Sequence, residues 1–266
     1  MTAPKFKHIY GPVHSWRMGM SLGIDPLSTK NKACNFNCSY CQLGVTSQFS
    51  WERRVFVPTG WVVEEVKSLP ADCRIDYLTF SGSGEPTLAS NLGEMMLALR
   101  DVRPEKIAVI TNSTTITRRD VQADLKLADL VLFKIDAADQ ATFERLNHPF
   151  PRLQIADIIK GIKDFRKTFK GKLALQIMFT AENQAQVPLI AQVAKDIAPD
   201  EVQLNTPLRP SPVKPLSEAE MAVLKTHFAG LKVLSVYEEE KKPYVPFDDA
   251  ATEERHGRFK GDKGQL

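Results

Sequence analysis

The stretch "KIAVITNSTTITRRDVQADLKLADLVLFKID" (106–136) decides the fold. It begins and ends with short apolar runs rich in β-branched residues, at 106–111 and 130–136, which are typical of strands buried on both faces. Between them, residues 118–128 carry apolar side chains at helical spacing. A strand, a helix and a second strand in this order predict two parallel strands joined by a right-handed crossover.

The same alternation continues on both sides of this unit and predicts a parallel α/β sheet. Its other expected strands are 21–25, 76–81, 172–179, 201–206 and 231–237. Its other expected helices are 61–69, 88–100, 153–168, 184–198 and 217–229, the last opened by a capping box of Ser217 and Glu220. Periodicity alone leaves both an open doubly wound sheet and a full or partial barrel as alternatives.

Composition indicates a folded protein of the cytoplasm. The 266 residues are 43% apolar and 25% charged, and the net charge of +3 is too small to indicate nucleic-acid binding by itself. No apolar run approaches the roughly 18 residues of a membrane span, and the first residues lack the apolar core of a signal peptide. We therefore expect a cytoplasmic location and no membrane partner.

The last residues differ from the rest of the chain. Segment 238–266 mixes charges of both signs with two prolines and three glycines. We expect an extended polar tail that follows the surface or is partly disordered. We expect Arg255, His256 and Arg258 to form a solvated charge cluster within it, with a position over an active site as the alternative.

Three of the four cysteines fall within "CNFNCSYC" (34–41), at the spacing C-x3-C-x2-C. Crowded cysteines in a reducing compartment indicate metal or redox chemistry rather than a disulfide framework. Three alternatives follow: an iron–sulfur cluster with one iron left without a cysteine, a zinc site completed by Cys73 or a histidine, or a redox pair of Cys38 and Cys41.

With Tyr40 as its aromatic residue, the pattern C-x3-C-x-aromatic-C resembles the signature of radical S-adenosylmethionine (SAM) enzymes. A second resemblance is "FSGSGEPTL" (80–88), similar to the Gly-Gly-Glu region of that superfamily. The resemblance implies a partial (β/α)6 TIM-like barrel of parallel strands with the extended C-terminal tail, divided as a barrel with an N-terminal extension (1–237) and the tail (238–266).

The resemblance also implies the cofactors and their chemistry. Cys34, Cys38 and Cys41 would bind three irons of a 4Fe–4S cluster, and SAM would chelate the fourth. Reduction of the cluster, by a donor such as flavodoxin or ferredoxin, would cleave SAM to methionine and a 5′-deoxyadenosyl radical that abstracts hydrogen from a substrate.

Functional side chains of such barrels sit at the carboxyl ends of strands, which places the expected SAM contacts. Glu85 would pair with the ammonium of SAM and Gly84 would let a ligand approach the main chain, whereas Asn112 and Asp136 would bind ribose hydroxyls. Asn112 as a cap and Asp136 as the start of a turn are the alternatives. The expected contacts are Tyr40, Ser83, Gly84, Glu85, Pro86, Asn112, Asp136, Gln176 and Asn205, with the Asn205 region facing adenine.

Segments 10–27 and 204–212 further resemble the branch of the superfamily related to tRNA wyosine synthase. Those enzymes carry a second cluster on three additional cysteines, whereas this chain has only Cys73 left. The same product is therefore not expected, and the substrate stays open between an RNA and a peptide or protein. Basic and aromatic side chains that could serve RNA are Arg17, Lys30, Lys32, Arg53, Arg54, Trp16, Phe49 and Trp51.

Two other functions fit parts of the sequence. A glycyl-radical enzyme activase shares the cysteine triad but has a glycine-rich N-terminal segment that "GPVHSWRMGMSLGID" (11–25) does not match well. A zinc-binding RNA-interaction module would use the three cysteines and one histidine as ligands.

Overall fold

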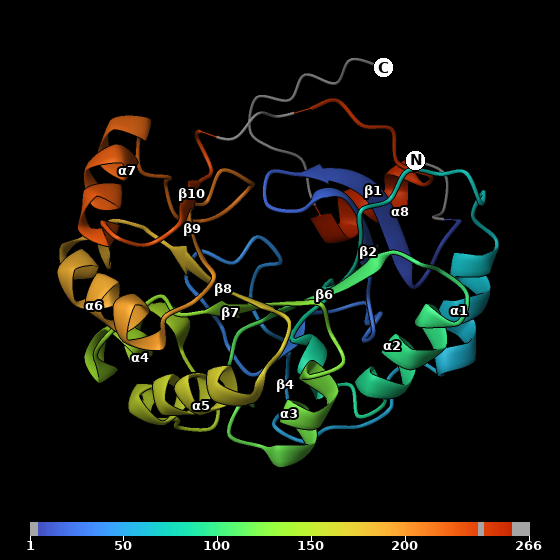
Figure 1. Ribbon diagram of the computed structural model, residues 1–266, viewed down its shortest axis with the longest axis horizontal. Helices are drawn as coiled ribbons and strands as arrows, with labels where there is room; N and C mark the ends of the chain where they lie inside the picture. Colours follow the sequence, from blue (N-terminus) through green and yellow to red (C-terminus); the bar gives the residue numbers. More distant parts are fainter. Residues whose placement is uncertain (1–4, 239–241, 257–266) are drawn as a thin grey trace.

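A computed structural model of the chain describes residues 5–238 and 242–256 (Figure 1). Within these residues one curled sheet has eight strands in the order β1-β2-β5-β6-β7-β8-β9-β10. Its strands are β1 (Ile9–Ser15), β2 (Gly19–Ile24), β5 (Tyr77–Phe80), β6 (Lys106–Thr111), β7 (Leu130–Lys134), β8 (Lys172–Met178), β9 (Glu201–Asn205) and β10 (Val233–Ser235). A second sheet has two strands, β3 (Ala33–Cys34) and β4 (Gln48–Phe49).

The strand order decides between the two sheet architectures. From β2 to β10 each strand pairs in parallel with the next strand of the order, while β1 pairs antiparallel with β2. This order runs in one direction and does not reverse at a switch point, as a doubly wound sheet does. Because β1 and β10 stay as edges, the sheet is a half-barrel, which confirms the expected partial barrel.

Helices surround the outer face of the curled sheet (Figure 1). They are α1 (Thr59–Lys67), α2 (Leu92–Arg100), α3 (Arg119–Leu125), α4 (Gln140–Asn147), α5 (Ile155–Thr168), α6 (Val187–Ile197) and α7 (Glu218–Lys225), with short 3-10 turns at η1 (Pro86–Leu88), η2 (Gln184–Gln186) and η3 (Thr226–Phe228). The capping box of Ser217 and Glu220 at α7 is present as expected.

The two faces of β7 show how the core is divided. Val131 and Phe133 point to the helices and belong to the main core, whereas Leu130 and Leu132 belong to a small inner cluster. Met18, from the turn between β1 and β2, packs into this inner cluster. The β1–β2 turn therefore covers the part of the inner face of the half-barrel that this cluster occupies.

Two helices, α4 and α8 (Asp249–His256), and three strands, β1, β3 and β4, were not expected from the sequence. Helix α4 begins at "DAADQ", which has turn composition, and is started by the Asp139 carboxylate accepting the backbone N–H of Thr142 at 2.9 Å. Strand β1 has a bulge in its register between Tyr10 and Val13, where Gly11 and Pro12 interrupt the pairing with β2.

The C-terminal segment is the clearest difference from expectation. Instead of an extended tail, residues Asp249–His256 form helix α8, which packs against β1. Asp248 caps this helix by accepting the N–H of Ala251 at 3.0 Å, and the N–H of Phe247 donates to Gly11 O at 2.7 Å. Arg258 lies outside the described residues, and the division at residue 237 stays a prediction.

In the described ranges, no helix combines the length and the apolar character that crossing a bilayer requires.

Candidate functional site

A cavity of about 280 Å³ opens on the inner side of the half-barrel. Its lining includes Cys34, Cys38 and Cys41, all with free thiols. The spacing of these cysteines predicted that they act together, and the structure brings all three to one cavity.

The cysteine loop is fixed to the end of β5 through Gly84. The N–H of Ala33 donates to Ser83 O and the N–H of Glu85 donates to Ala33 O, both at 3.0 Å. A Cβ atom at Gly84 would lie 1.6 Å from the Ala33 carbonyl oxygen. Gly84 also lines the cavity. Its lack of a side chain is required for this close contact between main chains, which places Cys34 beside Glu85.

Hydrogen-bond donors point at two of the sulfur atoms. The N–H of Phe36 and the amide of Asn112 donate to Cys34 Sγ at 3.4 and 3.6 Å. The amide of Asn147 donates to Cys38 Sγ at 3.4 Å. Donors of this kind tune iron–sulfur clusters by stabilising charge on the thiolate ligands.

Burial makes these thiols poor acids on their own. Burial, and then the charge of Glu85, raises the pKa of the Cys34 thiol to about 12, and burial also raises the pKa of Cys38. A bound metal would supply the positive charge that thiolates need in such surroundings.

The zinc alternative needs a fourth ligand beside the three cysteines. In residues 5–238 and 242–256, no three His, Cys, Asp or Glu side chains are close enough together to hold one metal ion. A zinc ion needs its ligands within about 2.0–2.3 Å, whereas a cubane cluster binds each cysteine through a different iron. Cys73 lies outside the cavity lining, is half-buried and accepts a hydrogen bond from Arg103 at 3.3 Å. Three thiols that line one cavity, two of them with hydrogen-bond donors, are a donor set that fits a cluster.

Glu85 lies buried at the end of β5 and lines the cavity. Its Oε1 accepts from the N–H and hydroxyl of Thr87 and from the Thr111 hydroxyl, and its Oε2 accepts from the N–H of Asn112 at 2.7 Å. Burial raises the pKa of Glu85 despite these bonds. A cationic group entering the cavity would stabilise the carboxylate.

Asp136 was expected at the ribose of SAM, but it is not among the cavity-lining residues. Its carboxylate accepts from the Tyr40 hydroxyl, from the Asn147 amide at 3.1 Å and from the N–H of Met178 at 2.8 Å. Asp136 therefore holds Tyr40 in place behind the cavity wall. Pro86 is likewise buried outside the lining, and Ser83 borders a smaller neighbouring pocket.

Replacing Asp136 by alanine is expected to lower the free energy of unfolding by roughly 3 kcal/mol, because several buried donors lose their acceptor. Urea unfolding followed by circular dichroism measures this. Exposed Asp72→Ala is the control and should change stability by less than about 0.5 kcal/mol. Equal stability of the two variants would show that Asp136 does not hold the wall.

Gln176 offers a donor to the cavity. It is buried on β8, lines the cavity, and its Nε2 has no hydrogen-bond partner within the described residues. Asn112 and Asn205 also line the cavity, but both side chains already have partners. Asn112 hydrogen-bonds to Asn35 and Thr114, and Asn205 accepts from the N–H of Thr206. Burying an amide N–H without an acceptor costs folding free energy, so the Gln176 amide indicates that a bound ligand supplies the acceptor.

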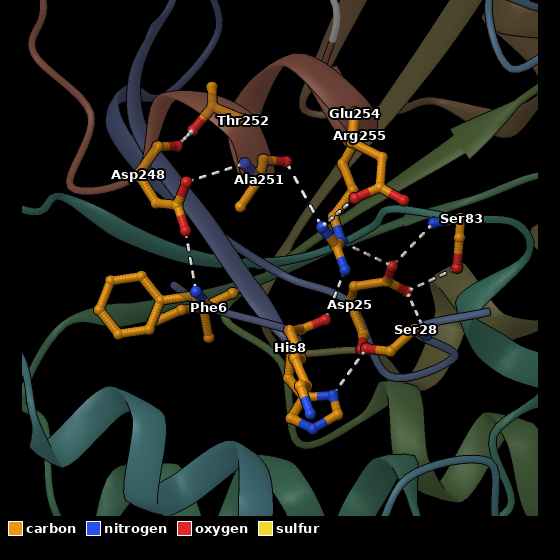
Figure 2. A network of polar contacts seen from close by, with 12 residues as sticks. Phe6, His8, Asp25, Ser28, Ser83, Asp248, Ala251, Thr252, Glu254 and Arg255 are labelled. Atoms are coloured by element: carbon orange, nitrogen blue, oxygen red, sulfur yellow. Dashed lines mark hydrogen bonds and ion pairs between the residues drawn. The ribbon is translucent and has the colours of Figure 1, made fainter. Parts of the chain in front are cut away.

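Helix α8 reaches the same cavity, contrary to the expected solvated charge cluster. Arg255 and His256 both line it. Figure 2 shows Arg255 pointing from α8 onto Asp25, with Nε and Oδ2 3.1 Å apart and side chains 9% and 1% exposed. Gln42, next to Cys41, donates to His256 O at 3.1 Å. The helix thus connects the C-terminal segment to the cysteine loop.

Replacing Arg255 by alanine is expected to cost about 3 kcal/mol of stability, because it leaves the buried Asp25 carboxylate without its cation. Hydrogen exchange of α8 should rise strongly in the same variant. Glu254→Ala is the control, since that side chain is 54% exposed and its pair with Arg255 is worth little. Unchanged exchange in Arg255→Ala would contradict the role of the ion pair.

The basic and aromatic residues expected to serve RNA do not form one surface. Arg53 pairs with Asp120 and Asp124, and its side chain is 5% exposed. Arg54 lies over the ring of Phe56 at 4.5 Å. From that set, the residues that line the cavity are Trp16, Arg17 and Lys32.

Comparison with known sequences shows the family of the chain. A model of the radical SAM superfamily matches residues 30–193. "UPF0026 protein slr1464" of Synechocystis sp. is 39% identical over 215 residues, which cover 79% of this chain and 78% of that protein. The chain belongs to the radical SAM superfamily and to the UPF0026 family. It is therefore an enzyme of that superfamily.

Solved structures agree on the fold. Streptococcus suis SuiB bound to its precursor peptide SuiA has a TM-score of 0.62 at 14% identity, covering 83% of this chain, which spans 50% of that one. Archaeal TYW1 has a TM-score of 0.57 at 13% identity, covering 83% of this chain and 74% of that one. These likenesses show that the chain shares the partial-barrel fold of both structures.

Several residues of the site were not found by sequence reasoning. Tyr10 and Arg209 line the cavity, and Asn35 and Asn147 support its wall. Arg209 carried a usable signal, because it follows a strand end in "LNTPLRPSP" (204–212). The other three carry no local signal, since their roles depend on contacts with distant segments.

Proposed function

We propose that this protein cleaves SAM reductively at a 4Fe–4S cluster bound by Cys34, Cys38 and Cys41. The observation that carries the proposal is one cavity, inside a radical SAM barrel, lined by three free thiols, a buried carboxylate and an unpaired amide donor. With SAM bound, the cluster supplies a 5′-deoxyadenosyl radical that takes hydrogen from a substrate.

In this proposal the residues of the chain bind and orient SAM and support the cluster. Glu85 pairs with the ammonium group of SAM, and Gln176 donates from β8 to an acceptor of SAM. The N–H and amide donors at Cys34 and Cys38 stabilise the thiolate ligands. Asn112 and Asn205 form parts of the cavity wall next to SAM, whereas Asp136 acts by positioning Tyr40.

The substrate of the proposed reaction is an unidentified RNA, peptide or other molecule. The chain lacks the three further cysteines that a second cluster needs, so a product of the wyosine type is not proposed. The proposed electron donor is a flavodoxin or ferredoxin. A cytoplasmic location is part of the proposal, because free thiols that bind an iron–sulfur cluster suit a reducing compartment.

Anaerobic reconstitution with iron and sulfide, followed by reductant and SAM, tests the proposal. Formation of 5′-deoxyadenosine and methionine, measured by liquid chromatography and mass spectrometry, is the expected result. A cluster-loaded protein that forms neither would overturn it, and purified protein that holds stoichiometric zinc without iron would favour the zinc module.

A further inference from the structure

Lys32 is a buried lysine to which the proposed function gives no role. Its side chain lines the cavity together with Cys34, and the residue is 7% exposed. Burying an ammonium group away from water costs folding free energy unless a negative charge lies nearby. An anion bound next to this ammonium would offset that cost.

The protein itself supplies no carboxylate partner for this ammonium. Within residues 5–238 and 242–256, Lys32 Nζ donates to Gly44 O at 3.2 Å, and no ion pair joins it to an acidic side chain. Glu85 lines the same cavity, but its oxygens accept from other donors. Lys134, the other lysine of the lining, differs because its Nζ lies 3.7 Å from Asp136 Oδ2.

The main chain places the side chains of Lys32 and Cys34 on one face. The carbonyl oxygens of both residues point to β4, where they accept from the N–H of Gln48 at 3.1 Å and the N–H of Ser50 at 3.4 Å. The N–H and carbonyl of Ala33, between them, bond to the segment after β5 instead. Side chains two residues apart in an extended chain share a face and lie ~7 Å apart.

The hydrogen bond to Gly44 fixes the ammonium at the cysteine loop. Gly44 comes after Cys41, and its N–H donates to Cys41 O at 3.0 Å. Lys32 thus precedes the first cysteine of the triad and contacts the segment that follows the last one. Its positive charge is held at the same loop that carries the three cysteines.

We propose that the Lys32 ammonium is a fixed counter-charge for the cluster and raises its reduction potential, an inference that rests on the proposed function. Reduction adds one electron to a cluster with thiolate ligands, so the reduced form carries more negative charge than the oxidised form. A buried positive charge at the same loop stabilises the reduced form more. A cluster of higher potential is easier for the proposed flavodoxin or ferredoxin to reduce.

Redox titration of the anaerobic, cluster-loaded protein with dithionite tests this without SAM, with electron paramagnetic resonance of the reduced cluster as the readout. Lys32→Gln and Lys32→Met should each lower the equilibrium constant for one-electron reduction at least tenfold, a fall in potential of about 59 mV. Lys32→Arg keeps the charge and should titrate like the wild type.

Lys30→Gln is the matched control. It removes the same charge from a neighbouring position, where the side chain is exposed and lies outside the lining of the cysteine cavity. Water and salt screen an exposed charge, so this variant should keep the wild-type potential.

Two other roles of Lys32 give different results in the same titration. If Lys32 only closes the cysteine loop, the neutral variants lose iron but keep the potential. The resonance signal comes from cluster-loaded protein alone, so a variant with less iron still reports its potential. If Lys32 only binds the carboxylate of SAM, Lys32→Gln weakens SAM binding and keeps the potential measured without SAM.

The inference is overturned if a neutral variant keeps the wild-type potential, or if Lys32→Arg or Lys30→Gln lowers the potential as far as Lys32→Gln does. Formation of 5′-deoxyadenosine in the same preparations tests the proposed function separately. SAM cleavage with a potential that does not depend on Lys32 would remove only the counter-charge. A potential that depends on Lys32 without SAM cleavage would overturn only the reductive cleavage, and a wild type that binds no reducible cluster would overturn both.

Discussion

Cys38→Ala is expected to reduce 5′-deoxyadenosine formation to the level of an assay without protein. Cys38 lines the cavity with the other two cysteines, and its sulfur accepts a hydrogen bond from Asn147. Two remaining thiolates would leave two irons of the cluster without protein ligands, so bound iron should fall together with activity. Iron analysis and chromatography of the same anaerobic sample measure both quantities.

Cys73→Ala is the matched control, because it removes a thiol that lies outside the cavity lining. It should keep the iron content and the activity of the wild type. Equal loss of iron in both variants would mean that the iron depends on the fold and not on the triad. Full activity of Cys38→Ala would contradict the assignment of this cysteine.

Gly84→Ala is expected to have the second largest effect. The added methyl group would lie 1.6 Å from the Ala33 carbonyl oxygen, which is main chain and cannot turn away like a side chain. Relief of the overlap must move the cysteine loop from the end of β5. We expect a loss of stability on the order of 3 kcal/mol, together with loss of cluster binding.

Urea unfolding and iron analysis measure the two effects of Gly84→Ala. Gly60→Ala is the control, since Gly60 lies in α1 and a Cβ there meets no atom within 4 Å. That variant should be as stable as the wild type or more stable by up to about 1 kcal/mol. A Gly84→Ala protein with wild-type stability and iron would show that the loop contact is not required.

The fold could be predicted in large part because each strand and helix of the βα units carries its own period. Runs such as 106–111 and 130–136 correspond to β6 and β7 within a few residues. Helix α8 could not be found this way, because its polar sequence is stabilised by contacts with β1 and by the pair of Arg255 with Asp25. Tertiary contacts of this kind leave no local period in the sequence.

The site could be predicted where its residues are close in the chain. Spacing brought Cys34, Cys38 and Cys41 together, and a strand end indicated Glu85. The same strand-end rule also selected Asp136, whose carboxylate accepts from Tyr40 and is not part of the cavity lining. A strand end fixes where a residue lies, but the direction of its side chain depends on partners from distant segments.

The glycyl-radical activase alternative stays a prediction, because its distinguishing feature is a partner protein. It shares SAM cleavage with the proposed function. A glycyl radical detected by electron paramagnetic resonance in a co-purified partner protein would favour the activase.

The central claim is that three cysteines hold a cluster with one iron left open for SAM. Mössbauer spectroscopy of the iron-57 reconstituted protein, before and after addition of SAM, tests it most directly. We expect about one quarter of the cluster signal to shift when SAM is added, because one iron of four lacks a cysteine ligand. A cluster whose irons all keep their spectrum with SAM present would contradict the claim.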